Sequence, residues 1–229
     1  MNSVKKTSIV LGIAFLLEVI TNIINGMVLR PALITTGNII ESMTNIANNV
    51  CLMKTYILVD MIVALEIVFL GAVLFIVLKK INEIIVLVAL GFFVISAALL
   101  ALSRMEAFSL LHISQEYIVA RQPDYLQMLG NLSVESMDFA GSVLHTLVFS
   151  IGAILFYYLF YKSRAVPRIL SLWGLITVPL VLIGALSKVL GYEVPFFVYL
   201  VLLYVPFEFV IGIWILAKGI KISEMIFEK

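Results

Sequence analysis

The sequence predicts an all-α protein that crosses a membrane six times, and three observations support this fold class. Of its 229 residues, 63% are hydrophobic and only 13% are charged. The mean hydropathy is +1.16, whereas soluble domains have a near-even balance of apolar and polar residues. Several apolar segments have about 20 residues or more, the length that an α-helix needs to cross a hydrocarbon core of about 30 Å. We expect a single membrane domain over residues 1–229, surrounded by the lipid bilayer.

The predicted spans are joined by short segments, with no separate soluble domain. They cover residues 7–29, 55–78, 84–103, 135–161, 169–189 and 197–217. An even number of spans places both termini on one side of the membrane. That side carries Lys5, Lys6, Lys79, Lys80, Lys162, Arg164, Arg168, Lys218, Lys221 and Lys229, and the other side carries Arg30, Lys54, Arg104, Arg121 and Lys188. Because Lys and Arg are enriched in cytoplasmic segments, we expect cytoplasmic termini and a multi-pass location in the cell membrane.

Polar residues share one face of the first span. Glu18, Thr21, Asn22 and Asn25 recur at helical spacing on an otherwise apolar helix. Amide and carboxyl groups that faced lipid would lack hydrogen-bond partners. This face is therefore predicted to point into the helix bundle.

Two segments outside the predicted spans are long enough to cover the outer helix ends. In residues 31–54, apolar residues recur at i, i+4, i+7 and i+11 from Ile39 to Val50, which predicts a short amphipathic helix in the outer interface. An ordered loop packed on the helix ends is the alternative. In residues 104–131, the third span is expected to continue as one helix until Pro123 ends it. Together the two segments are expected to form an external cap.

The second span contains two carboxylates, Asp60 near its outer end and Glu66 near its centre. Six residues correspond to about 600° of helical rotation, so these side chains are predicted to lie on different faces. Arg104 and Lys188 fall at the outer ends of the third and fifth spans, where we expect them to extend toward water. Pairing of these cations with Asp60 or Asp138 is the alternative.

The fourth span carries a second polar stripe. Glu135, Asp138, Ser142 and His145 lie at i, i+3, i+7 and i+10, which is one face of an α-helix. Asp138 and His145 are weak candidates for the acid and base of an intramembrane enzyme. That hypothesis requires the two side chains to meet.

A proline lies inside each of the last two spans. Pro179 and Pro206 each remove a backbone donor, so both helices are predicted to be locally broken. Glu208 follows Pro206 by two residues. A charged side chain at the centre of a membrane helix costs about 2.5 to 3.5 kcal/mol on insertion scales, so it usually faces the protein interior and is a functional candidate.

Two sequence strings carry a resemblance to a known family. They are S-R-x-V-P-R-x-L-S-x-W-G at residues 163–174 and F-E-x3-G-x-W-x3-K-G at residues 207–219, with a weaker A-L-E at residues 64–66. The chain resembles a family of bacterial six-helix membrane proteins known only as a domain of unknown function. The resemblance implies the fold, the topology and a bacterial plasma membrane, but no activity. Family members often carry an arginine and a glutamate in the third segment, whereas residues 91–100 have neither, so such charges are absent here or come from elsewhere.

The three central carboxylates are predicted to converge. Glu18, Glu66 and Glu208 fall near the midpoints of their spans, and His145 lies somewhat nearer the outer side. With Asn22, these residues are our candidates for a polar pocket that binds a proton or a small ligand. The alternative is structural, since a buried protonated carboxyl can donate a hydrogen bond to a facing helix.

Composition excludes several classes of function. The net charge of +1 without a basic cluster argues against nucleic-acid binding. One cysteine and two histidines argue against a zinc or haem site, and we expect no metal and no cofactor. The best prediction is a small transporter or ligand-binding protein, coupled to protons through Glu208 and Glu66. An intramembrane enzyme with a lipid-like substrate and an accessory membrane subunit are the alternatives. A non-enzymatic role is preferred, and a homo-oligomer is one of the partners considered.

Overall fold

The computed structural model describes residues 3–192 and 197–221, with side chains for residues 5–192 and 203–221. Within these ranges the secondary structure is entirely helical, with no strand. The helices are α1 (Ser3–Ile23), α2 (Arg30–Leu33), α3 (Ile39–Asn48), α4 (Val50–Leu78), α5 (Glu83–Val119), α6 (Asp124–Asp138), α7 (His145–Ser163), α8 (Arg168–Val189) and α9 (Phe197–Lys218). Two π-helical segments, η1 (Ile24–Leu29) and η2 (Phe139–Leu144), join α1 to α2 and α6 to α7. The predicted all-α class is confirmed.

Among the described residues, five helical segments are long and apolar enough to cross a membrane, which supports the prediction of a membrane protein. They are Lys5–Leu33, Val50–Leu78, Glu83–Val119, Asp124–Ser163 and Arg168–Val189. Each contains one of the first five predicted spans. The sixth predicted span coincides with the 22-residue helix α9, but the side chains at its start are outside the described set, as is Pro195 before it. The sixth crossing therefore stays a prediction.

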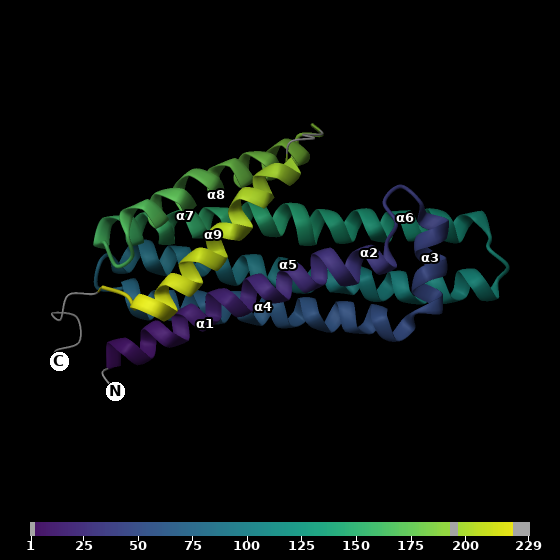
Figure 1. Cartoon of the computed structure of the whole chain (residues 1–229). Helices are drawn as coiled ribbons and strands as arrows, with labels where there is room; N and C mark the ends of the chain where they lie inside the picture. The colour runs from purple at the N-terminus through teal and green to yellow at the C-terminus, as the bar shows by residue number, and fades with distance from the viewer. Residues whose placement is uncertain (1–2, 193–196, 222–229) are drawn as a thin grey trace.

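Most of the helices run along one axis (Figure 1). Helices α4 and α5 pack together, α5 packs on α6 and α7, and α1 packs between α4 and α9. Helices α8 and α9 form a hairpin against α7 and α1. The start of α1 and the end of α9 lie at the same end of the bundle, where the Ile220 backbone N–H donates to Ser8 Oγ at 3.1 Å.

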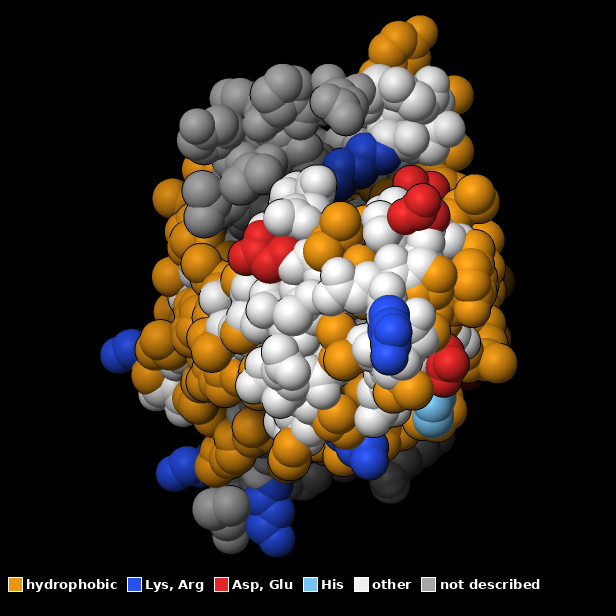
Figure 2. Space-filling model, turned by 90° about the vertical axis from the view of Figure 1, so that its right-hand side faces the viewer, with side chains coloured by type: hydrophobic (Ala, Val, Ile, Leu, Met, Phe, Trp, Pro, Cys, Tyr) orange, Lys and Arg blue, Asp and Glu red, His pale blue; other side chains and the backbone are white. Residues whose placement is uncertain are grey.

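Two helical rods are nearly twice as long as a hydrocarbon core is thick. The 37 residues of α5 and the 40 residues from Asp124 to Ser163 correspond to about 55 and 60 Å, against about 30 Å for the core. Helix α3 lies across these rods at the end far from the termini (Figure 1), where Met43 packs with Tyr117 and Leu126. Figure 2 shows polar and charged side chains gathered on this end face among hydrophobic ones. The predicted short helix is thus present, packed on the helix ends.

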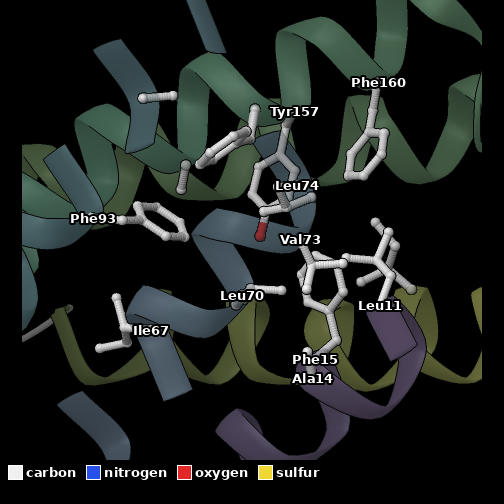
Figure 3. Packing of buried hydrophobic residues seen from close by; sticks show 14 of the residues in the cluster. Leu11, Ala14, Phe15, Ile67, Leu70, Val73, Leu74, Phe93, Tyr157 and Phe160 are labelled. Atoms are coloured by element: carbon white, nitrogen blue, oxygen red, sulfur yellow. The ribbon is translucent and has the colours of Figure 1, made fainter. Parts of the chain in front are cut away.

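The core contains side chains from four helices that converge at the centre of the bundle. Figure 3 shows Phe15 of α1, Leu74 of α4, Phe93 of α5 and Tyr157 of α7 close together, and all are at most 2% exposed. The rings of Phe93 and Phe149 stack with centroids 4.8 Å apart. In lipid, such van der Waals packing holds helices together, because lipid tails are as apolar as the side chains.

The prediction that α8 and α9 are broken at their prolines is wrong. Helix α8 continues through Pro179 and α9 continues through Pro206. A proline removes only one ladder hydrogen bond, which membrane helices tolerate when neighbouring groups compensate. The irregular winding lies instead at η1 and η2, in helices that contain no internal proline there.

Candidate functional site

A pair of carboxyl groups lies between the first and last described helices. Glu18 of α1 and Glu208 of α9 are 4% and 5% exposed, and their side chains lie next to each other. An ionised carboxyl is only an acceptor, so two carboxyls can share a hydrogen bond only when a proton lies between them. A proton shared by Glu18 and Glu208 would therefore join α1 to α9.

Close packing of two glycines brings these helices together. A Cβ added to Gly12 would lie 2.6 Å from Cγ of Leu216 and 3.0 Å from the carbonyl oxygen of Gly212. Side chains at these positions would separate the backbones, as at other small-residue crossings of membrane helices. The crossing places Glu18 and Glu208 at the same level of the bundle.

Hydrogen bonds extend from the carboxyl pair in two directions. The Tyr204 hydroxyl donates to Glu208 Oε1 at 2.5 Å, so the 3.1 Å contact between the Tyr157 and Tyr204 hydroxyls has Tyr157 as its donor. On the other side, Asn22 Nδ2 donates to Glu18 Oε1 at 2.6 Å. The result is a chain of polar groups that crosses from α7 through α9 to α1.

Glu66 of α4 lies beside this chain. Thr21 Oγ1 is 2.8 Å from the Leu17 carbonyl oxygen and 3.2 Å from Glu66 Oε1. Thr21 has one hydroxyl proton, so it donates to one of these two oxygens at a time. Glu66 Oε2 is buried without a hydrogen-bond partner. The structure thus brings Glu18, Asn22, Glu66 and Glu208 into one region, with Glu66 as a neighbour rather than a member of the chain.

No ion pair in the described part of the chain involves these carboxyls. The ion pairs Arg30–Asp138 and Arg104–Asp60 involve none of them. Among the described residues, no group of three or more His, Cys, Asp or Glu side chains is arranged to hold a metal ion.

His145 does not join the carboxyls as predicted. Its Nδ1 lies 3.0 Å from Ser96 Oγ and 3.1 Å from the Ser96 carbonyl oxygen. Asp138 instead binds Arg30, with Nη1 to Oδ1 at 2.8 Å and Nη2 to Oδ2 at 2.9 Å. The predicted stripe assumed α-helical winding, but η2 lies between Asp138 and His145 and has more residues per turn. The two candidates for acid and base therefore have separate partners.

Arg104 is buried rather than extended toward water. Its side chain is 5% exposed, and its Nη1 lies 2.5 Å from Asp60 Oδ2. Asn25 Nδ2 donates to the other oxygen of Asp60. The favoured expectation for Arg104 was wrong and the ion-pair alternative holds, because α5 carries this arginine alongside α4 rather than past its end.

Sequence reasoning missed both tyrosines of the chain. Tyr157 is 2% exposed and hydrogen-bonded. Tyr204 lies one helical turn before Glu208, and this i, i+4 spacing is a signal that was available. Tyr157 had no such local signal, because its partner is on another helix.

Comparison with known proteins identifies a family but no activity. A family model described as "Domain of unknown function (DUF4386)" matches residues 10–219, a range that includes the carboxyl pair and Glu66. No curated protein and no solved structure matches the chain.

Proposed function

We propose that this chain, which belongs to the DUF4386 family of unknown function, binds and releases protons at Glu18 and Glu208 as part of a small-molecule transport cycle. One observation supports this above all others: two buried carboxyls lie side by side, and no ion pair among the described residues involves either of them. Two adjacent negative charges in a medium of low dielectric constant repel strongly. Loss of the shared proton would therefore drive α1 and α9 apart, which couples protonation to helix movement.

The hydrogen-bonded chain favours a functional role over a purely structural one. A carboxyl that only holds helices together needs one partner on a facing helix. Here the pair is extended by Tyr204 and Tyr157 on one side and by Asn22 on the other. Such a chain provides successive donors and acceptors along which a proton can pass. We include Glu66 in the proposed site and leave His145 out, because it binds Ser96.

The topology is part of the same proposal. We propose six spans in a single membrane domain of the cell membrane, with both termini in the cytoplasm. Helix α3 and the turn between α5 and α6 would then form the outer cap. The distribution of Lys and Arg supports this orientation.

Infrared difference spectroscopy of the reconstituted protein tests proton binding. At neutral pH, the wild type is expected to show the carbonyl band of a protonated carboxyl, and alkaline buffer should remove it. Glu18→Gln and Glu208→Gln should each weaken this band. Glu116→Gln, which changes an exposed carboxyl on α5, is the matched control and should not. A band that is the same in both pair variants as in the wild type would contradict the proposal.

Transport is tested in vesicles that contain the protein and a trapped pH-sensitive dye. Organic cations, amino acids and sugars are added as separate classes, and the transported class should move protons across the membrane. Glu208→Gln should abolish that movement while the protein remains folded. Equal proton movement in the wild type and in Glu208→Gln would argue against coupling at this carboxyl.

A further inference from the structure

A second polar cluster lies where two helices change to π-helical winding. Asn25 of η1 donates to Asp60 of α4, whose other oxygen binds Arg104 of α5. Arg104 also donates to Ser103 Oγ from Nε at 3.0 Å and from Nη2 at 2.8 Å. Gly141 of η2 lies directly against this group, since a Cβ there would be 2.6 Å from Ser103 Oγ and 2.9 Å from Arg104 Nη2. The cluster therefore contacts both π-helical segments.

The polar groups of this cluster are buried, which is unfavourable unless the chain adopts the one conformation that pairs them. Asn25, Asp60, Ser103 and Arg104 are between 1% and 7% exposed. Moving a charge out of water is unfavourable, and the attraction within a buried ion pair offsets only about as much free energy as this costs. Such a pair therefore often selects one conformation of the chain without adding net stability. Asn25 Oδ1 has no hydrogen-bond partner, which leaves the cluster incompletely satisfied.

The cluster provides the main buried anchor of η1. Asn25 is the only buried residue of that segment. Its neighbours Met27 and Val28 are 69% and 59% exposed, and no atom lies within 4 Å of a Cβ built on Gly26. The π winding itself is shown by the backbone bonds from Arg30 N–H to Asn25 O and from His145 N–H to Ala140 O. Without the contact to Asp60, little else would keep η1 in this rare winding.

We propose that the Asp60–Arg104 ion pair is a latch that holds η1 and η2 in the π-helical state. A π-helical segment accommodates one more residue than the same length of α-helix. If the segment rewinds as α-helix, the helix that follows it rotates by about 100°. Release of the latch would turn α2 relative to α1, and α6 relative to α7. The half-exposed ion pair between Arg30, which directly follows η1, and Asp138, which directly precedes η2, would separate after this rotation.

The movement would open the end of the bundle that α3 covers. Asn25 follows Glu18 by two helical turns on the same rod, so the opened end would lead toward the carboxyl pair. This last step rests on the proposed function, whereas the latch itself does not.

Hydrogen exchange of the full chain in lipid nanodiscs, followed by mass spectrometry, tests the latch. In Asp60→Asn, amides in residues 24–30 and 139–145 should exchange at least about tenfold faster than in the wild type, because local opening becomes easier. Helix α8 should be unchanged. Glu116→Gln removes an exposed carboxyl from α5 and should leave both segments unchanged.

A second variant keeps the test decisive if Asp60→Asn does not fold. Gly141→Ala adds a methyl group against Ser103 and Arg104 without removing a charge, and it should accelerate exchange in the same two segments. Unchanged exchange there, or an equal rise in all helices, would overturn the latch. The infrared test can fail while this one succeeds, because exchange of these amides does not depend on the protonation of Glu18 or Glu208.

Discussion

Gly174 of α8 lies so close to Phe207 of α9 that a Cβ on Gly174 would be 2.7 Å from Cζ of Phe207. The same Cβ would be 2.8 Å from Cδ2 of Tyr157. Gly174 ends the sequence string at residues 163–174, and Phe207 begins the string at residues 207–219. The strings also meet near the termini, where the Lys221 N–H, just beyond the second string, donates to the Ala165 carbonyl oxygen at 2.8 Å. The two strings therefore pack on each other and position Glu208, the residue after Phe207.

Gly174→Ala should destabilise the fold and disturb the carboxyl pair. The added methyl group has no space, and overpacking of a filled core costs about 1 to 3 kcal/mol. Phe207 and Tyr157 would both move, so the infrared band of the protonated carboxyl should weaken along with the thermal unfolding midpoint. Gly91→Ala is the matched control, because nothing lies within 4 Å of its Cβ. Equal behaviour of the two alanine variants would refute the close contact.

Tyr157→Phe should isolate the outermost bond of the hydrogen-bonded chain. It removes the donor to the Tyr204 hydroxyl and keeps the ring packed on Phe207, whose centroid is 4.9 Å away. We expect a loss of about 0.5 to 1.5 kcal/mol in the free energy of unfolding. Tyr158→Phe changes an exposed neighbour and should have no measurable effect. The measurement is denaturant unfolding in detergent, and a cost for Tyr158→Phe that matches Tyr157→Phe would show that the chain contributes nothing.

Ser8→Ala should loosen the contact between α1 and the residues after α9. The Ile220 N–H is buried and donates to Ser8 Oγ, so its loss leaves an unpaired donor at a cost of about 1 to 3 kcal/mol. Limited proteolysis should then cleave near residue 220 faster than in the wild type. Ser109→Ala alters an exposed hydroxyl that bonds only within its own helix and should leave cleavage unchanged. Unaltered cleavage in Ser8→Ala would mean that other contacts hold this segment.

The sequence by itself determined the helices and the depth of the charged residues. An apolar chain in lipid must satisfy its backbone groups internally, so long apolar segments form helices whatever their neighbours. Position along each helix then fixes depth, which is why Glu18 and Glu208 could be predicted at one level. Local rules also identified α3, which begins after Asn38, whose side chain accepts from the Glu41 N–H at 3.1 Å.

Only the tertiary structure decided which side chains face each other. The rotation of a helix about its axis depends on its packing against other helices, so Tyr157 rather than His145 extends the carboxyl chain. The approach of α1 to α9 depends on Gly12 and Gly212, which are distant in the sequence. At η2 the winding departs from 3.6 residues per turn, so α-helical spacing no longer relates Asp138 to His145. The depth of a side chain in the membrane thus follows from its position along its own helix. Which side chain it faces is set by contacts between segments that are far apart in the sequence.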